Sequence, residues 1–296
     1  MATTSVSNGA RAAGIPSETS DPRETSKPLS LPGKDIRWPA SAIWRSGEPE
    51  VRTISFADLK DAIIKGIDDF SAMPSHAFFL CLIYPVIGII LYRLAFGYGV
   101  LPLIYPFVTG FALVGPAAAI GLYELSRRRE RGLEVSVAKA LEVRNSPSIG
   151  AIMRLGSVLA VLFFGWLYTA QTIYTQHFGP TPPTSLEQFF SDVTTTDAGR
   201  QLMIVGNLVG LLFAVVVLAI STVSFPMLVD RNVGAAVAVR TSLRAAIENP
   251  IVIASWGIIV VTSLLLGSLP MFVGLTVVLP VLGHTTWHLY RKLVAD

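Results

Sequence analysis

The sequence predicts an all-α, polytopic membrane protein with six transmembrane helices arranged as three hairpins, each preceded by an amphipathic interfacial helix. Of the 296 residues, 52% are hydrophobic and 15% are charged, whereas soluble domains average about 25% charged residues. Six apolar stretches reach or approach the roughly 20 residues that a spanning helix needs, and they lack the alternation of barrel strands. They cover residues 77–95, 100–122, 154–174, 202–226, 251–269 and 271–290.

Residues 1–50 differ in composition from the rest of the chain. Ser, Thr, Pro, Gly and Ala dominate up to Leu31 without apolar periodicity, which is typical of disorder. We therefore divide the chain into a disordered cytoplasmic tail, residues 1–50, and a six-helix transmembrane domain, residues 51–296. Because no basic segment followed by an apolar core opens the sequence, we expect no cleavable signal peptide.

The first interfacial helix is predicted between Ser55 and Pro74. Ser55 and Asp58 form the pattern of a capping box, in which each side chain accepts a hydrogen bond from the other residue's backbone. Apolar residues then recur at spacings of three and four, which predicts one apolar helix face. They are Phe56, Leu59, Ile63, Ile67 and Phe70.

Two further copies of this pattern precede the third and fifth spans. In residues 132–147 the apolar face consists of Leu133, Val137, Ala140 and Leu141; in residues 235–250 it consists of Val239, Leu243, Ala246 and Ile247. Each copy ends near a proline, where the missing amide hydrogen costs little at the start of a helix. We therefore interpret the chain as three repeats of interfacial helix and hairpin, although prolines are frequent in membrane helices in any case.

The distribution of basic residues predicts that both termini are cytoplasmic, in a bacterial inner membrane. With that orientation, 9 Lys or Arg precede the first span, 7 lie between spans two and three, 3 lie between spans four and five, and 2 follow span six. These are 21 of the 23 basic residues, and cytoplasmic loops of membrane proteins carry such an excess. The only sizeable segment predicted on the other side is the loop of residues 177–200.

Between the interfaces, the six stretches contain essentially no Asp, Glu, Lys or Arg. Ion-coupled transporters use such groups within the membrane, so the uncharged interior disfavours a proton relay. Asn207 lies between Gly206 and Gly210, at a spacing that lets two helices approach closely. We interpret these three residues as a helix-packing site.

His284 and His288 are the candidate metal ligands, because a separation of four residues places them on one helix face. His76 could supply a third ligand from the same side of the membrane. In the alternative interpretation, the two histidines and Trp287 anchor the last helix at the interface. Paired histidines alone specify no metal, and Cys81, the single cysteine, excludes a cysteine-built site. We therefore expect no cofactor and keep metal or haem ligation as the alternative.

Basic side chains near the span ends are expected to contact lipid. At the cytoplasmic surface, anionic headgroups attract such residues, and tryptophan favours the same interface. The residues expected there are Arg127, Arg128, Arg129, Arg131, Arg240, Arg244 and Trp287. Glu124 is expected to pair with Arg127 or Arg128, and Asp230 to cap the start of the following helix.

Four groups of residues carry a family resemblance. They are Arg52–Leu59 with Gly66–Phe70, Gly121–Gly132, the segment with Phe225, Pro226 and Asp230, and Gly283–Arg291. In these segments, over about residues 50–292, the chain resembles the bacterial integral membrane family called domain of unknown function 2189. The resemblance implies a membrane protein without an established activity. Some members are labelled cytochrome c oxidase proteins, but a catalytic haem–copper subunit uses more histidine ligands than the 4 that this chain contains.

These observations favour a non-enzymatic interaction or scaffold protein. We expect it to contact the lipid bilayer, anionic headgroups and other membrane proteins, but no nucleic acid. The sequence has no phosphate-binding loop, nucleophile elbow or Cys-x-x-Cys pair. One alternative is an accessory or haem- or metal-handling protein associated with a respiratory oxidase. A second is a transporter of an uncharged or lipid-like small molecule.

Overall fold

The structure is a computed structural model that describes residues 49–73, 101–181, 183, 185–269 and 273–295. All of these residues fall within one compact unit, Ser46–Asp296. They form helices and, apart from an isolated antiparallel bridge between Val51 and Val294, no β-structure. In chain order the elements are α1 (Phe56–Ala72), η2 (Leu101–Leu103), α3 (Ile104–Ala118), α4 (Ile120–Glu130), α5 (Val137–Ala140), η3 (Leu141–Asn145), α6 (Ile149–Phe178), α7 (Leu186–Thr195), α8 (Asp197–Ser221), α9 (Ser224–Asp230), α10 (Ala235–Glu248), α11 (Pro250–Ser268) and α12 (Leu275–Leu293).

Within the described residues, three helices are long and apolar enough to cross a membrane: α6, α8 continued into α9, and α11. A fourth span results if Leu101–Gly110 and Ala112–Ala118, which are bent by 41°, count as one helix. Six spans in three hairpins are therefore not confirmed. The predicted first span, residues 77–95, lies outside the described residues, and α12 does not meet the same criterion of length and composition.

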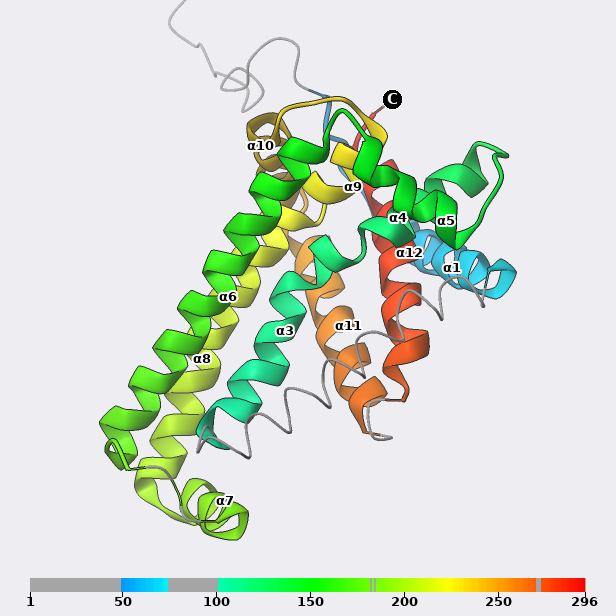
Figure 1. The fold of residues 1–296 in the computed structure, drawn as a ribbon. Helices are drawn as coiled ribbons and strands as arrows, with labels where there is room; N and C mark the ends of the chain where they lie inside the picture. Colours follow the sequence, from blue (N-terminus) through cyan, green and yellow to red (C-terminus); the bar gives the residue numbers. More distant parts are fainter. Residues whose placement is uncertain (1–48, 74–100, 182, 184, 270–272, 296) are drawn as a thin grey trace, which may run out of the picture. The chain divides into compact units, whose positions relative to one another are not determined.

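Trp166 of α6 organises the contact between α3, α6 and α8, which Figure 1 shows side by side. Its indole Nε1 donates a hydrogen bond to the carbonyl oxygen of Pro106 at 2.8 Å. A Cβ atom added to Gly110 of α3 would lie 2.6 Å from the indole, and one added to Gly210 of α8 would lie 3.0 Å from it. Small residues on two helices therefore make room for one large residue on the third.

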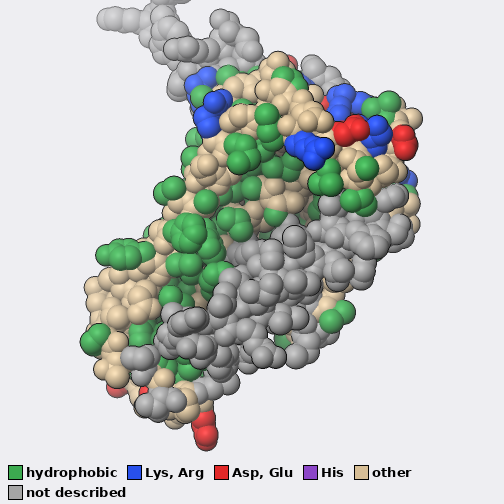
Figure 2. Space-filling view, viewed as in Figure 1, with side chains coloured by type: hydrophobic (Ala, Val, Ile, Leu, Met, Phe, Trp, Pro, Cys, Tyr) green, Lys and Arg blue, Asp and Glu red, His purple; other side chains and the backbone are tan. Residues whose placement is uncertain are grey.

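A second region, which we call the polar cap, consists of α1, α4, α5, η3, α10, the part of α12 from Gly283 onward, and α9, which is the last part of the candidate span Asp197–Asp230. In Figure 1, α4, α9 and α10 lie at the opposite end of α6 and α8 from α7. Figure 2 shows Lys and Arg side chains gathered at the same end, with hydrophobic side chains along the spans. The largest side chains fully buried in the cap are Tyr123, Phe225, Trp287 and Tyr290.

Helix α1 begins with the predicted capping box, which is confirmed. The Ser55 hydroxyl accepts a hydrogen bond from the Asp58 amide at 3.3 Å, and the Asp58 carboxylate accepts one from the Ser55 amide at 3.0 Å. Asn249, at the junction of α10 and α11, holds the segment before α1: its side chain accepts from the Ile54 amide at 2.8 Å and donates to the Arg52 carbonyl at 3.1 Å. The cap therefore connects chain segments that are distant in sequence.

The predicted apolar face of α1 is wrong in part. Leu59 of that face is buried against the rest of the protein, but Phe56 and Ile67 are exposed, while Gly66 and Asp69 are buried instead. The reason is the close approach of α1 and α12. A Cβ atom at Gly66 would lie 2.2 Å from the hydroxyl oxygen of Thr285 and 2.7 Å from its amide nitrogen, so the contact selects small residues.

The second interfacial helix does not form as predicted. Residues 132–147 contain only the four-residue α5 and the short 3-10 helix η3. Ser136 caps α5 by accepting a hydrogen bond from the Lys139 amide, and Ser146 is extended, as residues before a proline prefer to be. These two signals leave too few residues between them for a long helix.

The third predicted interfacial helix is present as α10, with a different face buried. Ile247 of the predicted apolar face is exposed, whereas the buried residues are small: Ala238, Thr241, Ser242 and Ala245. Ser242 explains one of these positions, because its hydroxyl donates to the carbonyl of Ala219 at 2.7 Å and accepts from the amide of Val223 at 3.2 Å. The location of α1 and α10 at a membrane interface stays a prediction.

Candidate functional site in the polar cap

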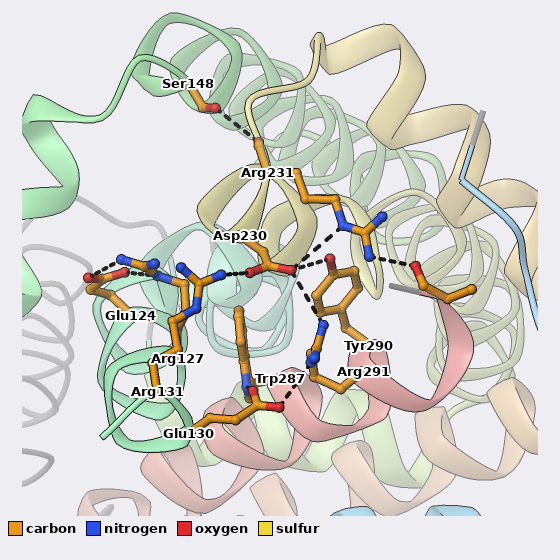
Figure 3. A network of polar contacts seen from close by, with 11 residues as sticks. Glu124, Arg127, Glu130, Arg131, Ser148, Asp230, Arg231, Trp287, Tyr290 and Arg291 are labelled. Carbon is orange, nitrogen blue, oxygen red and sulfur yellow. Dashed lines mark hydrogen bonds and ion pairs between the residues drawn. The ribbon is translucent and has the colours of Figure 1, made fainter. Parts of the chain in front are cut away.

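Asp230 is the centre of a network of polar contacts that joins α4, α9 and α12 (Figure 3). One carboxylate oxygen accepts a hydrogen bond from Arg131 at 2.6 Å, and the other accepts one from the Tyr290 hydroxyl at 2.8 Å. Arg231 and Arg291 each lie 3.7 Å from the second oxygen. The predicted role of Asp230 as a helix-start cap is wrong, because it is the last residue of α9 and does not begin α10.

Glu124 forms a second carboxylate centre on α4. Arg127 donates two hydrogen bonds to it, at 2.6 and 2.7 Å, and Arg128 donates one at 2.8 Å. The pairing expected from the sequence is therefore confirmed. Arg128 also donates to Glu142 of η3 at 2.8 Å, so the network extends from α4 to the loop before α6.

Glu130, at the end of α4, connects the network to α12 (Figure 3). Its carboxylate accepts a hydrogen bond from the indole of Trp287 at 3.0 Å and one from Arg291 at 3.1 Å. Trp287 was assigned to the lipid interface from sequence, but its ring is buried inside the cap. This tryptophan therefore fixes α12 against α4 through both packing and a hydrogen bond.

Asp69 of α1 is the centre of a third, buried cluster. It accepts hydrogen bonds from Ser126 at 2.5 Å and from Arg129 at 2.5 Å, and the imidazole Nε2 of His288 lies 2.8 Å from it. Burial opposes ionisation of this carboxyl, but the hydrogen bonds from His288, Ser126 and Arg129 outweigh it and lower the pKa of Asp69 to about 2. Asp69 is therefore a carboxylate that binds α1 to α4 and α12.

His284 is fully buried next to this cluster, with Nδ1 at 2.7 Å from the Ser126 hydroxyl oxygen. Ser126 has one hydroxyl proton, and it donates that proton to Asp69. In the neutral ring, Nδ1 of His284 therefore carries the hydrogen and donates it to Ser126. Its Nε2 is left as an acceptor, and no described residue offers it a hydrogen-bond partner.

The two predicted metal ligands meet the same carboxylate but do not form a metal-binding group. Nε2 of His288 is bonded to Asp69, and Nδ1 of His284 is 3.9 Å from it. In the part of the chain that the structure describes, no group of three or more His, Cys, Asp or Glu side chains could hold a metal ion. His76, the possible third ligand, lies outside the described residues.

A cleft of about 440 Å³ lies between α4, η3 and α9. Arg127, Arg128 and Arg231 line it together with Glu124, Asp230 and Glu142. The side chains of Glu124 and Asp230 are only 4% and 6% exposed, whereas the three arginine side chains are between 14% and 25% exposed. The buried carboxylates hold the guanidinium groups in place. The accessible charge of the cleft comes from the three arginines and from Glu142, whose side chain is 44% exposed and pairs with Arg128.

The other residues singled out from the sequence lie outside this cleft. Arg244 forms an ion pair with Glu248 one helical turn away on α10, at 2.7 Å. Arg240 is half-buried on the same helix. Gly210 packs against Trp166, whereas Gly206 has open space beside it and Asn207 is exposed on α8. Contact of the basic residues with lipid headgroups stays a prediction.

Sequence reasoning missed Asp69, Ser126 and Tyr290 as members of the site. The spacing of Asp69 from Leu59, three turns earlier on α1, places both on one helix face. An acid on a face that also carries Ala62 and Gly66 was the available signal for a buried carboxylate. Ser126 and Tyr290 gave no such signal, because their partners are distant in sequence.

Long apolar helices with exposed large hydrophobic side chains define this molecule as an integral membrane protein. Residues 104–230 match the model of a family described as a predicted integral membrane protein, DUF2189. The match confirms the family resemblance over these residues, which comprise α3 to α9 and include Glu124, Arg131 and Asp230. No curated protein and no solved structure matches the chain.

Proposed function

We propose that this integral membrane protein is a non-enzymatic interaction protein whose polar cap binds an acidic segment of another protein. The observation that carries the proposal is the arrangement of the cleft between α4, η3 and α9. Guanidinium groups of three arginines line the cleft beside Glu124 and Asp230, which are almost fully buried, while Glu142 is the exposed acid among the lining residues. Planar guanidinium groups in fixed positions are suited to bind carboxylates through paired hydrogen bonds.

The network below the cleft supports this function, because it holds the arginines before a partner arrives. Arg127 and Arg128 are each bonded to Glu124, so they lose little conformational freedom when they bind an external carboxylate. Asn145, Ser146, Ser148 and Asn232 add uncharged polar groups to the cleft wall. Such groups suit the backbone of a polypeptide, in addition to its charges.

The spans support an interaction role over ion-coupled transport. Helix α11 contains no charged residue, and the charged residues of α6 and α8 are Arg154, Asp197 and Arg200, within the first turns of those helices. A pathway for a charged substrate uses ionisable groups deeper in the membrane. The polar chemistry of the described residues is concentrated in the cap.

A binding experiment with purified full-length protein tests the proposal. The probe is a fluorescent peptide of alternating Glu and Gly, and the control peptide has Gln in place of Glu. We expect the Glu peptide alone to bind, and Arg128→Gln to weaken binding roughly tenfold, since about 1.4 kcal/mol corresponds to a factor of ten. Added salt should weaken it further.

Arg244→Gln is the matched control. Arg244 is 14% exposed, as Arg128 is, and each pairs with a glutamate one helical turn away, but Arg244 lies outside the cleft. Its substitution should leave peptide binding unchanged. Equal binding of both peptides, or equal loss in both variants, would contradict the proposal. If phosphatidylglycerol vesicles bind the protein, Arg128→Gln weakens that binding, and the Glu peptide does not compete with it, the cleft would be assigned to lipid headgroups instead.

A second candidate function, metal or haem handling, has one observation in its favour. Nε2 of His284 is a buried acceptor without a described partner, and Ser126 orients its ring through Nδ1; hydrogen bonds of that kind orient ligand histidines in metal sites. An absorption spectrum and metal analysis of the purified protein test it. A Soret band or stoichiometric metal that is lost in the double variant His284→Ala, His288→Ala would support it; neither signal in the wild type would end it.

A further inference from the structure

A polar pair lies exposed on the apolar surface of the spans. The Tyr105 hydroxyl of α3 donates a hydrogen bond to the Asn207 side-chain oxygen of α8 at 2.7 Å, and both side chains are exposed. Asn207 is about 15 Å along α8 from Asp197, by the rise per residue of a helix. Asn207 also lies within the predicted span of residues 202–226, which places this pair inside the hydrocarbon core.

Among the residues that the structure describes, the hydrogen-bonding capacity of this pair is only partly used. The Asn207 amide nitrogen donates one hydrogen to the Met203 carbonyl at 2.7 Å, and the side-chain oxygen accepts one from Tyr105. An asparagine amide has two hydrogens and two oxygen lone pairs, and a tyrosine oxygen can accept as well as donate. A spare donor and spare acceptors therefore face an environment of lipid tails that offers neither.

The surface around Asn207 forms a shallow groove on one face of α8. Met203, Ile204, Leu208 and Leu211 line this groove of about 470 Å³ together with Asn207. Gly206 and Gly210 lie on a different face of the helix, on which Gly210 contacts Trp166 of α6. The groove therefore faces away from the contact of α8 with α6.

We propose that this groove binds a second copy of the same chain, so that α8 of each copy packs against α8 of the other. A two-fold symmetric interface brings the same residues together. The spare amide hydrogen of each Asn207 then meets the spare acceptors of Asn207 and Tyr105 in the other copy. Lipid tails cannot supply these groups, and a different partner would need a matching polar pair, whereas a second copy carries one by symmetry.

Cysteine cross-linking in native membranes tests the contact. In a Cys81→Ser background, Leu211→Cys places a thiol in the groove, and Val161→Cys places one on the exposed surface of α6. We expect oxidation to give a disulfide-linked dimer of the Leu211→Cys protein and only background linkage for Val161→Cys. Equal linkage at the two positions would overturn the proposal.

A pair of leucine substitutions distinguishes interface contact from loss of folding. Leu208 lines the groove and Leu265 lies on α11, and their side chains are 59% and 61% exposed, so truncating either one leaves no cavity within one copy. Leu208→Ala should weaken the Leu211→Cys cross-link, whereas Leu265→Ala should leave it unchanged. Both variants should keep the wild-type melting temperature.

Asn207→Leu tests the hydrogen bonds. We expect it to lower the dimer fraction of fluorescently labelled protein in vesicles, with a dissociation constant increased about tenfold. Single-molecule photobleaching that shows only monomers for the wild type would overturn the proposal. A photo-crosslinker at Leu208 that yields an adduct with another protein, or a link within one chain, would do the same.

Discussion

Most of the large, fully buried apolar side chains lie in the polar cap, whereas the spans carry many exposed ones. Leu228 and Leu289 in the cap are fully buried, whereas Val161 of α6 and Leu265 of α11 are 71% and 61% exposed. Where the cap faces water, the transfer of apolar surface out of water drives the burial. Lipid tails are as apolar as leucine, so the spans associate through packing and a few polar contacts. One chain thus follows two rules of packing.

Charged side chains also differ in burial between the polar cap and the opposite end of the spans. In the cap, Glu124, Asp69 and Asp230 are buried and are held by arginine, serine, histidine or tyrosine donors. At the opposite end of α8, Asp197 pairs with Arg200 at 3.3 Å while 86% of its side chain is exposed. Equivalent substitutions in the two regions should therefore have very different costs.

The largest difference is expected between Asp230→Ala and Asp197→Ala. Loss of Asp230 leaves Arg131 and its neighbours without their buried counter-charge, which should cost about 4 kcal/mol of unfolding free energy. Loss of the exposed Asp197 should cost less than about 1 kcal/mol. Unfolding of each variant in mixed detergent micelles, followed by circular dichroism, measures both. Equal costs would show that the network around Asp230 contributes no more than a surface pair.

Leucine truncation should show the next largest difference. Leu228→Ala leaves a cavity in the cap and should lower the unfolding free energy by about 3 kcal/mol. Leu265→Ala, on the exposed face of α11, should have almost no effect in lipid, because an acyl chain takes the place of the lost side chain. Unfolding in bicelles compares the two variants. A similar loss for both would mean that Leu265 packs against protein.

Glycine substitution tests the close contact of α1 and α12. Gly66→Ala forces the new Cβ against Thr285 and should cost about 2 kcal/mol by overpacking. Gly156→Ala in α6 meets open space, and the higher helix propensity of alanine should leave stability unchanged or raised. The melting temperatures of the two variants give the comparison. A stable Gly66→Ala protein would argue against the α1–α12 packing.

The smallest effect, and the only one set by pH, concerns Asp69. Its folded-state pKa of about 2 is below the ordinary value near 3.8, so the stabilisation is present above the ordinary pKa and is lost as the pH falls through the folded-state pKa. It should amount to about 2 kcal/mol at neutral pH. The difference in unfolding free energy between the wild type and Asp69→Asn should therefore shrink between pH 4 and about pH 2. A difference that stays constant from pH 7 to pH 2 would contradict this role of Asp69.

Interactions between residues close in sequence could be predicted. The capping box of Ser55 and Asp58 and the pairing of Glu124 with Arg127 and Arg128 both follow from helical spacing, and both are present. The same local logic failed for residues 132–147, because Ser136 starts a helix there and Pro147 stops it too soon. Apolar periodicity without attention to these two signals predicted a helix that was too long.

Interactions between distant residues could not be predicted. Asp69 and His288 are 219 positions apart, and Asp230 meets Tyr290 60 positions away. His284 and His288 were recognised as lying on one face, but that both face Asp69 depends on how α1 packs against α12. Ser126 joins the cluster for the same reason, since α4 brings it between them.

The sequence by itself determined that this is a helical membrane protein, where α6, α8 and α11 run, and that its basic residues gather at one end. These properties add up residue by residue, because each apolar or charged side chain has its own preference for lipid or water. The tertiary structure alone decided which charges are buried together and where the cleft between α4, η3 and α9 lies. It also decided that Asn207 and Tyr105 meet on an exposed surface. Such contacts depend on the packing of helices that are far apart in the chain, and no local preference records that packing.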